Sequence, residues 1–352
     1  MDCYERLARH LDRLPGGYPP TETGAELRML KRLFTPDEAD LAVYLTLNRE
    51  EASTIGLRAG ILAAEAEQRL SEMAHKGLIF SVQSNDGRFL YQAAPWVVGI
   101  YEFQLNRLNE EFIRDFNELV PARMKDPRAK NVIPQIRTIP LRRSVEAGLE
   151  ILPYEMAAVL VGAHDKFAVA PCICRRKADI SGKGCDAPLE SCLMLGDWAD
   201  YFVRNSLGRY IDSEEVKDIL AKADEANLVI QPSNSQKASF MCTCCGCCCG
   251  VLTRVKMHPK PSTVVASPFI ATADPETCDG CGTCVDRCQM DAIDLVEQRV
   301  SLNSDRCIGC GLCVSTCPTD SLSLLRKPVG EQVRVPTDMV ATWKEVGVAW
   351  AE

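Results

Sequence analysis

The chain has 352 residues, a formal net charge of −8 and 25% charged residues, an ordinary composition apart from its 19 cysteines. This length allows two or three domains that each bury a core of their own. The net acidity is a weak argument against a nucleic-acid partner, because duplex binding depends on clustered Lys and Arg. Apart from Cys3, every cysteine lies between positions 172 and 317.

The chain carries no obvious export or membrane signal. Its N-terminus lacks the apolar segment of a signal peptide, and apolar stretches such as residues 156–162 are far shorter than the roughly 20 residues that span a bilayer. We therefore expect a soluble, cytoplasmic protein. Closely spaced cysteines in a reducing compartment are metal ligands or redox thiols rather than a disulfide framework.

Residues 25–120 are predicted to be mainly helical. Thr35 is a typical N-cap, with Pro36 at the first helical position and acidic residues in the first turn. Two further helices are expected over residues 53–59 and 63–76. The following segment, LIFSVQSNDGRFLYQAA, predicts a β-hairpin, because two β-rich runs flank the turn sequence SNDG.

Three helices followed by a hairpin resemble a winged helix-turn-helix domain over roughly residues 25–95. That fold occurs in DNA-binding regulators and in many protein-protein modules. The third helix would be the DNA reader, yet it carries three acidic residues, Glu65, Glu67 and Glu72. Residues 25–95 hold 8 Lys and Arg against 10 Asp and Glu. We therefore favour a docking or dimerisation module over DNA binding.

A helical segment is expected from residue 95 to 120, and residues 121–143 read as an extended, basic linker punctuated by proline. We place a domain boundary near residue 125. The region from 144 to 239 is predicted to be mixed, with helices over residues 151–164, 195–206 and 213–227. It contains the first closely spaced cysteines.

Two copies of the spacing CxxCxxCxxxC follow, as CDGCGTCVDRC from Cys278 and CIGCGLCVSTC from Cys307. Such a loop can direct three thiolates and several backbone amides at a cubane cluster, and its glycines let the chain close around the cluster. Zinc knuckles are disfavoured, because they pair two CxxC units across a longer gap. Since thiolates would saturate every iron, the expected use is electron transfer.

This pattern resembles the bacterial dicluster ferredoxins over about residues 274–326. The resemblance implies two 4Fe-4S clusters, one held by Cys278, Cys281, Cys284 and Cys317, the other by Cys307, Cys310, Cys313 and Cys288. One departure is Gln289, which stands where the family has proline after the first repeat. Ligation should survive, because that proline shapes the turn and is not a ligand.

A second cysteine field lies upstream, where six cysteines fall within eight residues of the run CTCCGCCC. In an extended chain, alternation would place Cys242, Cys244 and Cys248 on one side and Cys245, Cys247 and Cys249 on the other, although Gly246 and Gly250 could disturb this. We expect a subset of the field to hold one or two further iron-sulfur clusters. The candidates are Cys172, Cys174, Cys185, Cys192, Cys242, Cys244, Cys245, Cys247, Cys248 and Cys249.

Two other interpretations of this field stay open, a structural zinc site and a redox-active thiol cluster without metal. Neither explains why these cysteines adjoin a ferredoxin. Over residues 150–326 the whole pattern resembles a group of multicluster iron-sulfur proteins of anaerobes. Arg175 and Arg176, beside the first CxC, could support a cluster from outside its ligands or form a surface ion pair.

The expected fold class is α+β multidomain. Its domains are residues 1–125 (winged-helix-like and helical docking), 126–262 (mixed, with the upstream cysteines), 263–330 (dicluster ferredoxin) and 331–352 (a C-terminal tail). In the tail, Val340, Trp343 and Val346 or Trp350 share one helical face that we expect to pack on the chain's own core. The alternative is a helix that docks a redox partner.

The predicted function is relay of low-potential electrons between redox partner proteins, as a non-catalytic subunit of an anaerobic oxidoreductase. No nucleotide or flavin fingerprint is visible, and no catalytic residue is assigned. The alternatives are a redox-sensing winged-helix regulator and an enzyme that binds substrate at an unusual cluster. The N-terminal domain could also support a homo-oligomer.

Overall fold

A computed structural model describes residues 1–126, 128, 133–140, 144 and 149–351. It divides into two compact units: unit 1 comprises Met1–Val132, Asp197–Arg209 and Val340–Glu352, and unit 2 comprises Ile133–Gly196 and Tyr210–Met339. Unit 2 therefore contains the cysteines of both the predicted mixed domain and the predicted ferredoxin domain. The finer domain bounds stay predictions. No helix in the described part of the chain is both long and apolar enough to cross a membrane.

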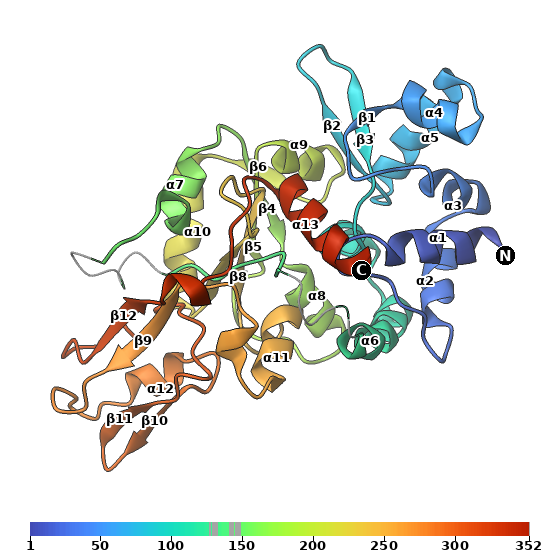
Figure 1. Ribbon diagram of the computed structural model, residues 1–352. Helices are drawn as coiled ribbons and strands as arrows, with labels where there is room; N and C mark the ends of the chain where they lie inside the picture. Colours follow the sequence, from blue (N-terminus) through green and yellow to red (C-terminus); the bar gives the residue numbers. More distant parts are fainter. Residues whose placement is uncertain (127, 129–132, 141–143, 145–148, 352) are drawn as a thin grey trace. The chain divides into compact units, whose positions relative to one another are not determined.

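Unit 1 is mainly helical and carries one small sheet of strand order β1-β3-β2 (Figure 1). Its helices are α1 (Cys3–Asp12), α2 (Ala25–Leu33), α3 (Pro36–Ala42), α4 (Ala52–Ala59), α5 (Ala63–His75), α6 (Glu110–Lys125), α9 (Asp197–Arg204) and α13 (Met339–Ala351). Its strands are β1 (Glu50–Glu51), β2 (Phe80–Gln83) and β3 (Phe89–Gln92). Trp96–Ile100 forms an irregular turn with non-helical dihedral angles at residues 97–99, and a helical turn spans Glu102–Arg107.

Several predicted elements of unit 1 are confirmed. Thr35 caps α3 by accepting from the backbone N–H of Glu38. The two helices expected after α3 are α4 and α5, and the expected hairpin is the antiparallel pair β2 and β3. The predicted linker begins too early, because residues 121–125 belong to α6. Residues 127, 129–132 and 141–143 of that linker lie outside the described residues.

Aromatic side chains form the core of unit 1 around α9. The ring of Tyr201 lies 4.7 Å from that of Phe80 and 4.6 Å from that of Phe103. Its hydroxyl donates to the backbone carbonyls of Ala74 and Ile79. Trp343 of α13 is only 2% exposed, and its ring lies 6.3 Å from Trp198. The tail helix thus packs on the chain's own core as predicted, although the side chain of Trp350 lies outside the described residues.

Unit 2 is built on a five-stranded sheet of order β6-β4-β5-β8-β7. Strand β4 pairs with β5, β5 with β8 and β8 with β7, and all three pairs are antiparallel. Its strands are β4 (Phe167–Pro171), β5 (Glu190–Leu195), β6 (Arg209–Ile211), β7 (Val229–Pro232) and β8 (Phe240–Cys244). Its helices are α7 (Ala157–Gly162), α8 (Ile173–Ile180), α10 (Ser213–Glu225) and α11 (Gly250–Met257), with helical turns at Pro153–Glu155 and Pro261–Thr263. Helices α7, α9 and α10 fall in the segments predicted to be helical.

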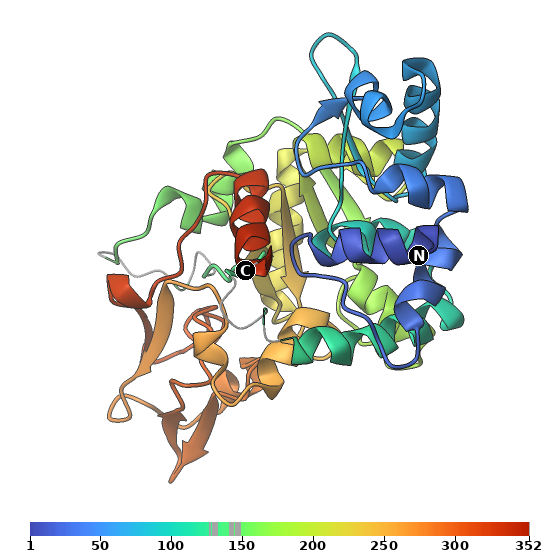
Figure 2. The same ribbon diagram turned by 45° about the vertical axis from the view of Figure 1, so that its right-hand side comes forward.

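The remainder of unit 2 carries the two cysteine repeats on two small sheets. Strand β9 (Phe269–Ala273) pairs with β12 (Leu322–Arg326), and β10 (Ile293–Val296) pairs with β11 (Arg299–Leu302). Helix α12 (Thr283–Arg287) lies beside the β10–β11 hairpin, which is orange in Figures 1 and 2. A helical turn at Val329–Glu331 follows β12. These short elements and the five-stranded sheet share one hydrophobic core that includes most of the cysteines.

The packing of α13 can be tested by truncating its buried anchor. Trp343→Ala should lower the free energy of unfolding by about 3–5 kcal/mol, because it leaves a cavity against Trp198. Urea denaturation of the full chain, followed by far-UV circular dichroism, measures this loss. Lys344→Ala, on the exposed side of the same helix, should change it by no more than about 0.5 kcal/mol. Equal effects of the two substitutions would contradict the packing of α13.

Candidate iron-sulfur sites

The cysteine repeats form tight loops that only glycine can complete. Gly280 and Gly309 have φ values of 76° and 67°, in the left-handed region. A Cβ on Gly309 would lie 2.2 Å from the carbonyl oxygen of Phe269, and one on Gly280 would lie 2.5 Å from that of Gln298. Each loop therefore runs against a neighbouring backbone with no room for a side chain, which holds its cysteines in place.

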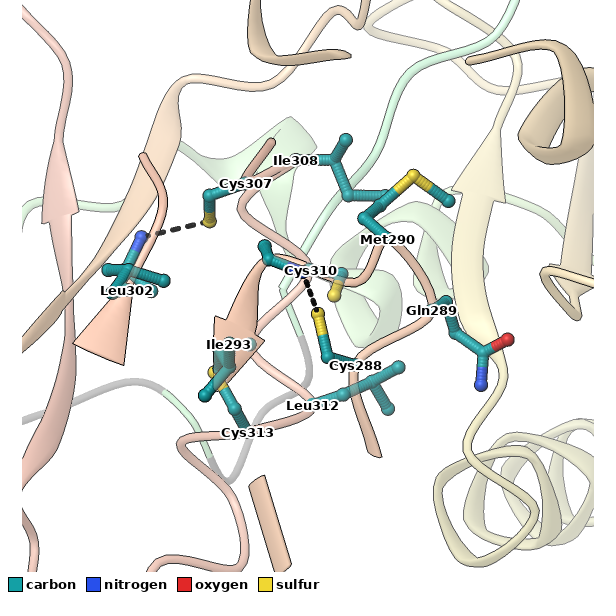
Figure 3. Close-up of a pocket in the computed structure, with 13 residues that line it drawn as sticks. Cys288, Gln289, Met290, Ile293, Leu302, Cys307, Ile308, Cys310, Leu312 and Cys313 are labelled. Atoms are coloured by element: carbon teal, nitrogen blue, oxygen red, sulfur yellow. Dashed lines mark hydrogen bonds between the residues drawn. The ribbon is translucent and has the colours of Figure 1, made fainter. Parts of the chain in front are cut away.

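The two repeats line two separate cavities. The first cavity is lined by Cys278, Cys281, Cys284 and Cys317, together with Asp279, Gly282, Thr283, Leu295, Pro318 and Ser321. The second cavity is lined by Cys288, Cys307, Cys310 and Cys313, together with Ala271, Gln289, Met290, Ala292, Ile293, Leu302, Ile308, Gly311 and Leu312 (Figure 3). Each cavity thus takes three cysteines from one repeat and one from the other. These are the two sets named from the sequence, and their role as cluster ligands stays a prediction.

Apart from the thiols and Gln289, the side chains that line the second cavity are apolar. Burial raises the pKa of Cys310 to about 12, so the thiol stays neutral until a cation replaces its proton. Two backbone N–H groups point at sulfurs, from Ala271 to Cys307 over 3.3 Å and from Ala292 to Cys288 over 3.2 Å (Figure 3). Such donors stabilise a thiolate and tune the potential of a bound cluster. Four thiols, a glycine cradle and amide donors fit a 4Fe-4S cluster.

The first cavity is closer to solvent. Cys281 is exposed, whereas Cys278 and Cys284 are buried. Burial raises the pKa of Cys317, but hydrogen bonds from Ser321 and Thr319 outweigh it, so the net pKa is lowered. The hydroxyl of Ser321 lies 3.2 Å from that sulfur. A cluster here would therefore meet the surface through Cys281.

Six of the upstream cysteines meet at one end of the five-stranded sheet. Cys192 of β5 lies directly opposite Cys242 of β8, so the two side chains share a face of the sheet, and Cys244 lies two residues further along that face. Helices α8 and α11 begin immediately after Cys172 and Cys249. We call Cys172, Cys174, Cys192, Cys242, Cys244 and Cys249 the six-cysteine group.

The thiols of the six-cysteine group interact in an unbroken series. Hydrogen bonds from Cys192 and Cys244 lower the pKa of Cys242, and those from Cys174 and Cys244 lower the pKa of Cys249. The hydrogen bond with Cys174 raises the pKa of Cys172. These thiols lie close together, with Cys244 and Cys249 buried, and a set crowded in this way favours binding of cations.

The other four upstream cysteines form a separate, tighter set. The sulfur atoms of Cys185, Cys245, Cys247 and Cys248 all lie within 4.8 Å of one another. Cys185 comes from the loop between α8 and β5, and the other three come from the turn between β8 and α11. We call these residues the four-cysteine site. Cys245 and Cys248 are buried, Cys185 is half-buried and Cys247 is exposed.

The expected alternation along CTCCGCCC is correct for part of the run. Cys242 and Cys244 do share a side, because both lie in strand β8. The placement of Cys248 with them is wrong, and so is that of Cys249 with Cys245 and Cys247. The strand ends at Cys244, and the chain turns before α11 begins at Gly250, so the period of two no longer holds.

Arg175 lies between the two upstream sets. Its side chain is buried, so the alternative of a surface ion pair is wrong for this residue, whereas Arg176 is exposed. The guanidinium donates to the carbonyl oxygens of Pro188 and Thr243, each over 2.6 Å. Burial raises the pKa of Cys245, but a backbone hydrogen bond and the charge of Arg175 reduce it to about 7. Arg175 therefore balances thiolate charge near both sets.

The upstream cysteines and the ferredoxin loops contact each other within unit 2. The backbone N–H of Gly246 donates to Oε1 of Gln289 over 2.6 Å. Gly246 stands between two members of the four-cysteine site, and Gln289 follows Cys288 of the second cavity. Nearby, Arg287 forms a 2.6 Å ion pair with Asp224 of α10. Gln289 was noted in the sequence as a departure from the family pattern, and this contact gives it a role that proline could not fill.

Comparison with known proteins bears on the C-terminal part of the chain. Residues 271–324 match the family model described as 4Fe-4S dicluster domain. No curated protein and no solved structure matches the chain. The matched segment contains all eight cysteines that line the two cavities. The dicluster domain and the upstream cysteine clusters together indicate an iron-sulfur protein with a role in electron transfer.

Proposed function

We propose that this chain relays low-potential electrons between redox partners as a non-catalytic subunit of an oxidoreductase complex. The observation that carries the proposal is the pair of four-thiol cavities, each completed by one cysteine of the other repeat. Interlocked ligand sets of this kind hold two clusters at a fixed separation. With four cysteines each, both 4Fe-4S clusters would have every iron occupied, which leaves electron transfer as their chemistry.

The six-cysteine group supports a third cluster in the same relay. It lies in the same compact unit as the two cavities, and its sulfurs already converge from three separate segments of the chain. The contact between Gly246 and Gln289 joins the turn after β8 to the loop of Cys288. Electrons held at the six-cysteine group would thus have a short packed route to the second cavity.

The first cavity is the proposed point of exchange with a partner. Cys281 is exposed, and the surrounding segments carry exposed acidic residues. These are Asp274, Glu276, Asp279, Asp286, Asp294 and Glu297. A partner that docks here should present a basic face, because complementary charge accelerates encounter and orients the two proteins.

For the N-terminal module, we propose a winged-helix-like arrangement of α3, α4, α5 and the β2–β3 hairpin that serves protein docking. Helix α5, which would read DNA in a regulator, bears an exposed Arg69–Glu65 ion pair of 2.6 Å. On the same helix, Glu67 accepts from the hydroxyl of Tyr91 over 2.6 Å. Its acidic residues would repel phosphate, which supports docking over transcriptional regulation.

Metal analysis tests the number of clusters. Protein purified without oxygen should contain about 12 iron and 12 acid-labile sulfide per chain, from three 4Fe-4S clusters. The double variant Cys244→Ala/Cys249→Ala should lose about 4 iron and keep about 8, because the cavities of the two repeats are separate from the six-cysteine group. EPR of the reduced protein should show the corresponding loss of signal.

The matched control for that experiment is Cys3→Ala. Cys3 lies in α1 of unit 1, away in sequence from every other cysteine, so its removal should leave iron and sulfide unchanged. Full retention of iron in the double variant would remove the third cluster from the proposal. Protein that is colourless and free of iron would refute the electron-transfer function altogether.

Neutralising the acidic surface tests the docking site. The triple variant Glu276→Gln/Asp279→Asn/Asp286→Asn should slow reduction of a cationic c-type cytochrome about tenfold at low salt, because steering by complementary charge is lost. The difference should disappear near 1 M salt, where charges are screened within about 3 Å. Stopped-flow absorbance measures both rates.

The control neutralises three exposed acids of unit 1 instead, Glu22, Asp37 and Glu72. It matches the change in net charge, so its rate should stay close to that of the unmodified chain. An equal loss of rate in both variants would show that overall charge, and not this surface, governs the encounter.

A further inference from the structure

We propose that the four-cysteine site binds a single zinc ion in a tetrahedron of thiolates, and not an iron-sulfur cluster. The site is separate from the two cavities and from the six-cysteine group, and none of its four cysteines lines either cavity. The assignment holds whether or not the six-cysteine group carries a cluster.

The distances between sulfurs match one central ion. The sulfur of Cys185 lies 3.9 Å from that of Cys245 and 3.6 Å from that of Cys248. The sulfur of Cys247 lies 3.7 Å from that of Cys248. With Zn–S bonds of about 2.3 Å, the edge of a regular tetrahedron is about 3.8 Å. These three sulfur separations lie on both sides of this value.

The cysteine sulfurs of the two ferredoxin cavities are spaced more widely than those of the four-cysteine site. A cubane puts a separate iron at each corner, so its four cysteine sulfurs stand further apart than ligands of a single ion. Among the described residues, no three cysteines of either cavity lie within 4.8 Å of one another, whereas all four of the four-cysteine site do. A cubane core would not fit between four sulfurs that all lie this close to one another.

The number of thiols argues against a metal-free redox centre. A redox-active pair uses two cysteines, whereas four converge here, with three of their sulfur separations between 3.6 and 3.9 Å. Four converging thiols without a cation would place partial negative charges against one another. Arg175 offsets part of that charge from the side of Cys245, and a divalent ion at the centre would neutralise most of the remainder.

Tetrahedral sulfur ligation is typical of zinc or iron, and zinc is favoured by its higher affinity for such sites. The ion would join two segments 60 residues apart, the loop of Cys185 and the turn of Cys245. Closing so long a loop restricts the unfolded chain and couples metal binding to folding. The same turn carries Gly246, whose N–H contacts Gln289, so the ion would fix the junction with the ferredoxin loops.

The test is quantification of zinc, iron and acid-labile sulfide in the full chain purified without oxygen. The unmodified protein should contain about one zinc per chain. Cys247→Ala should lower zinc at least about tenfold and leave iron and sulfide unchanged, because Cys247 is an exposed ligand of this site alone. Cys185→Ala should give the same result from the other segment, and Cys3→Ala should change nothing.

Zinc-edge X-ray absorption of the unmodified protein gives a readout that does not depend on a variant's folding. It should show four sulfur ligands at about 2.3 Å. Loss of both iron and sulfide in Cys247→Ala would overturn the proposal in favour of a cluster, and iron without sulfide at this site would overturn the choice of zinc. Zinc retained in Cys247→Ala and Cys185→Ala would also overturn it. Protein that contains zinc at this site but no iron would refute the proposed electron relay and would leave the zinc assignment standing.

Discussion

The organisation of unit 2 depends on one constraint, the need for cations where thiols are crowded together. Every cysteine except Cys3 lies in this unit, and most are buried or half-buried. A thiolate away from water is costly unless a positive charge or a hydrogen-bond donor faces it. Glycine loops, backbone N–H donors and the buried Arg175 all meet that need in part. Iron and zinc would meet the rest, so the core of this unit and its metal sites would form together.

The ferredoxin loops and the upstream cysteines behave as one structure through a few polar contacts. Gln289 accepts from Gly246 where the family pattern has proline, and Arg287 pairs with Asp224 with both side chains largely buried. Arg306 adds a hydrogen bond to the carbonyl oxygen of Lys256, at the end of α11. Removing one partner of such buried pairs leaves the other unsatisfied, which is more costly than the contact itself is stabilising. The dicluster module is therefore adapted to this chain and not a freely exchangeable domain.

The sequence was informative where spacing alone sets geometry. The two ferredoxin sets follow from contiguous runs, in which loop closure brings three cysteines together, and the structure gathers these same sets around two cavities. The cap at Thr35 and the β2–β3 hairpin are likewise local features. The partition of the upstream field was not predictable. It depends on the pairing of Cys192 with Cys242 and on the approach of Cys185 to a turn 60 residues away. Alternation also failed at Cys248, because the chain leaves the strand before it.

The positions of the proposed metal sites assign them different roles, one structural and the others in electron transfer. Three cysteines of the four-cysteine site lie on the turn that leads from Cys244 to Cys249, two members of the six-cysteine group. Gly246 of the same turn contacts Gln289, which follows Cys288. An ion at this junction that could change oxidation state would compete for electrons with the clusters on either side. Zinc has no accessible redox chemistry, so it would fix the positions of the two neighbouring sites without accepting an electron. A redox-inert ion is therefore the chemically consistent occupant of a junction in an electron relay.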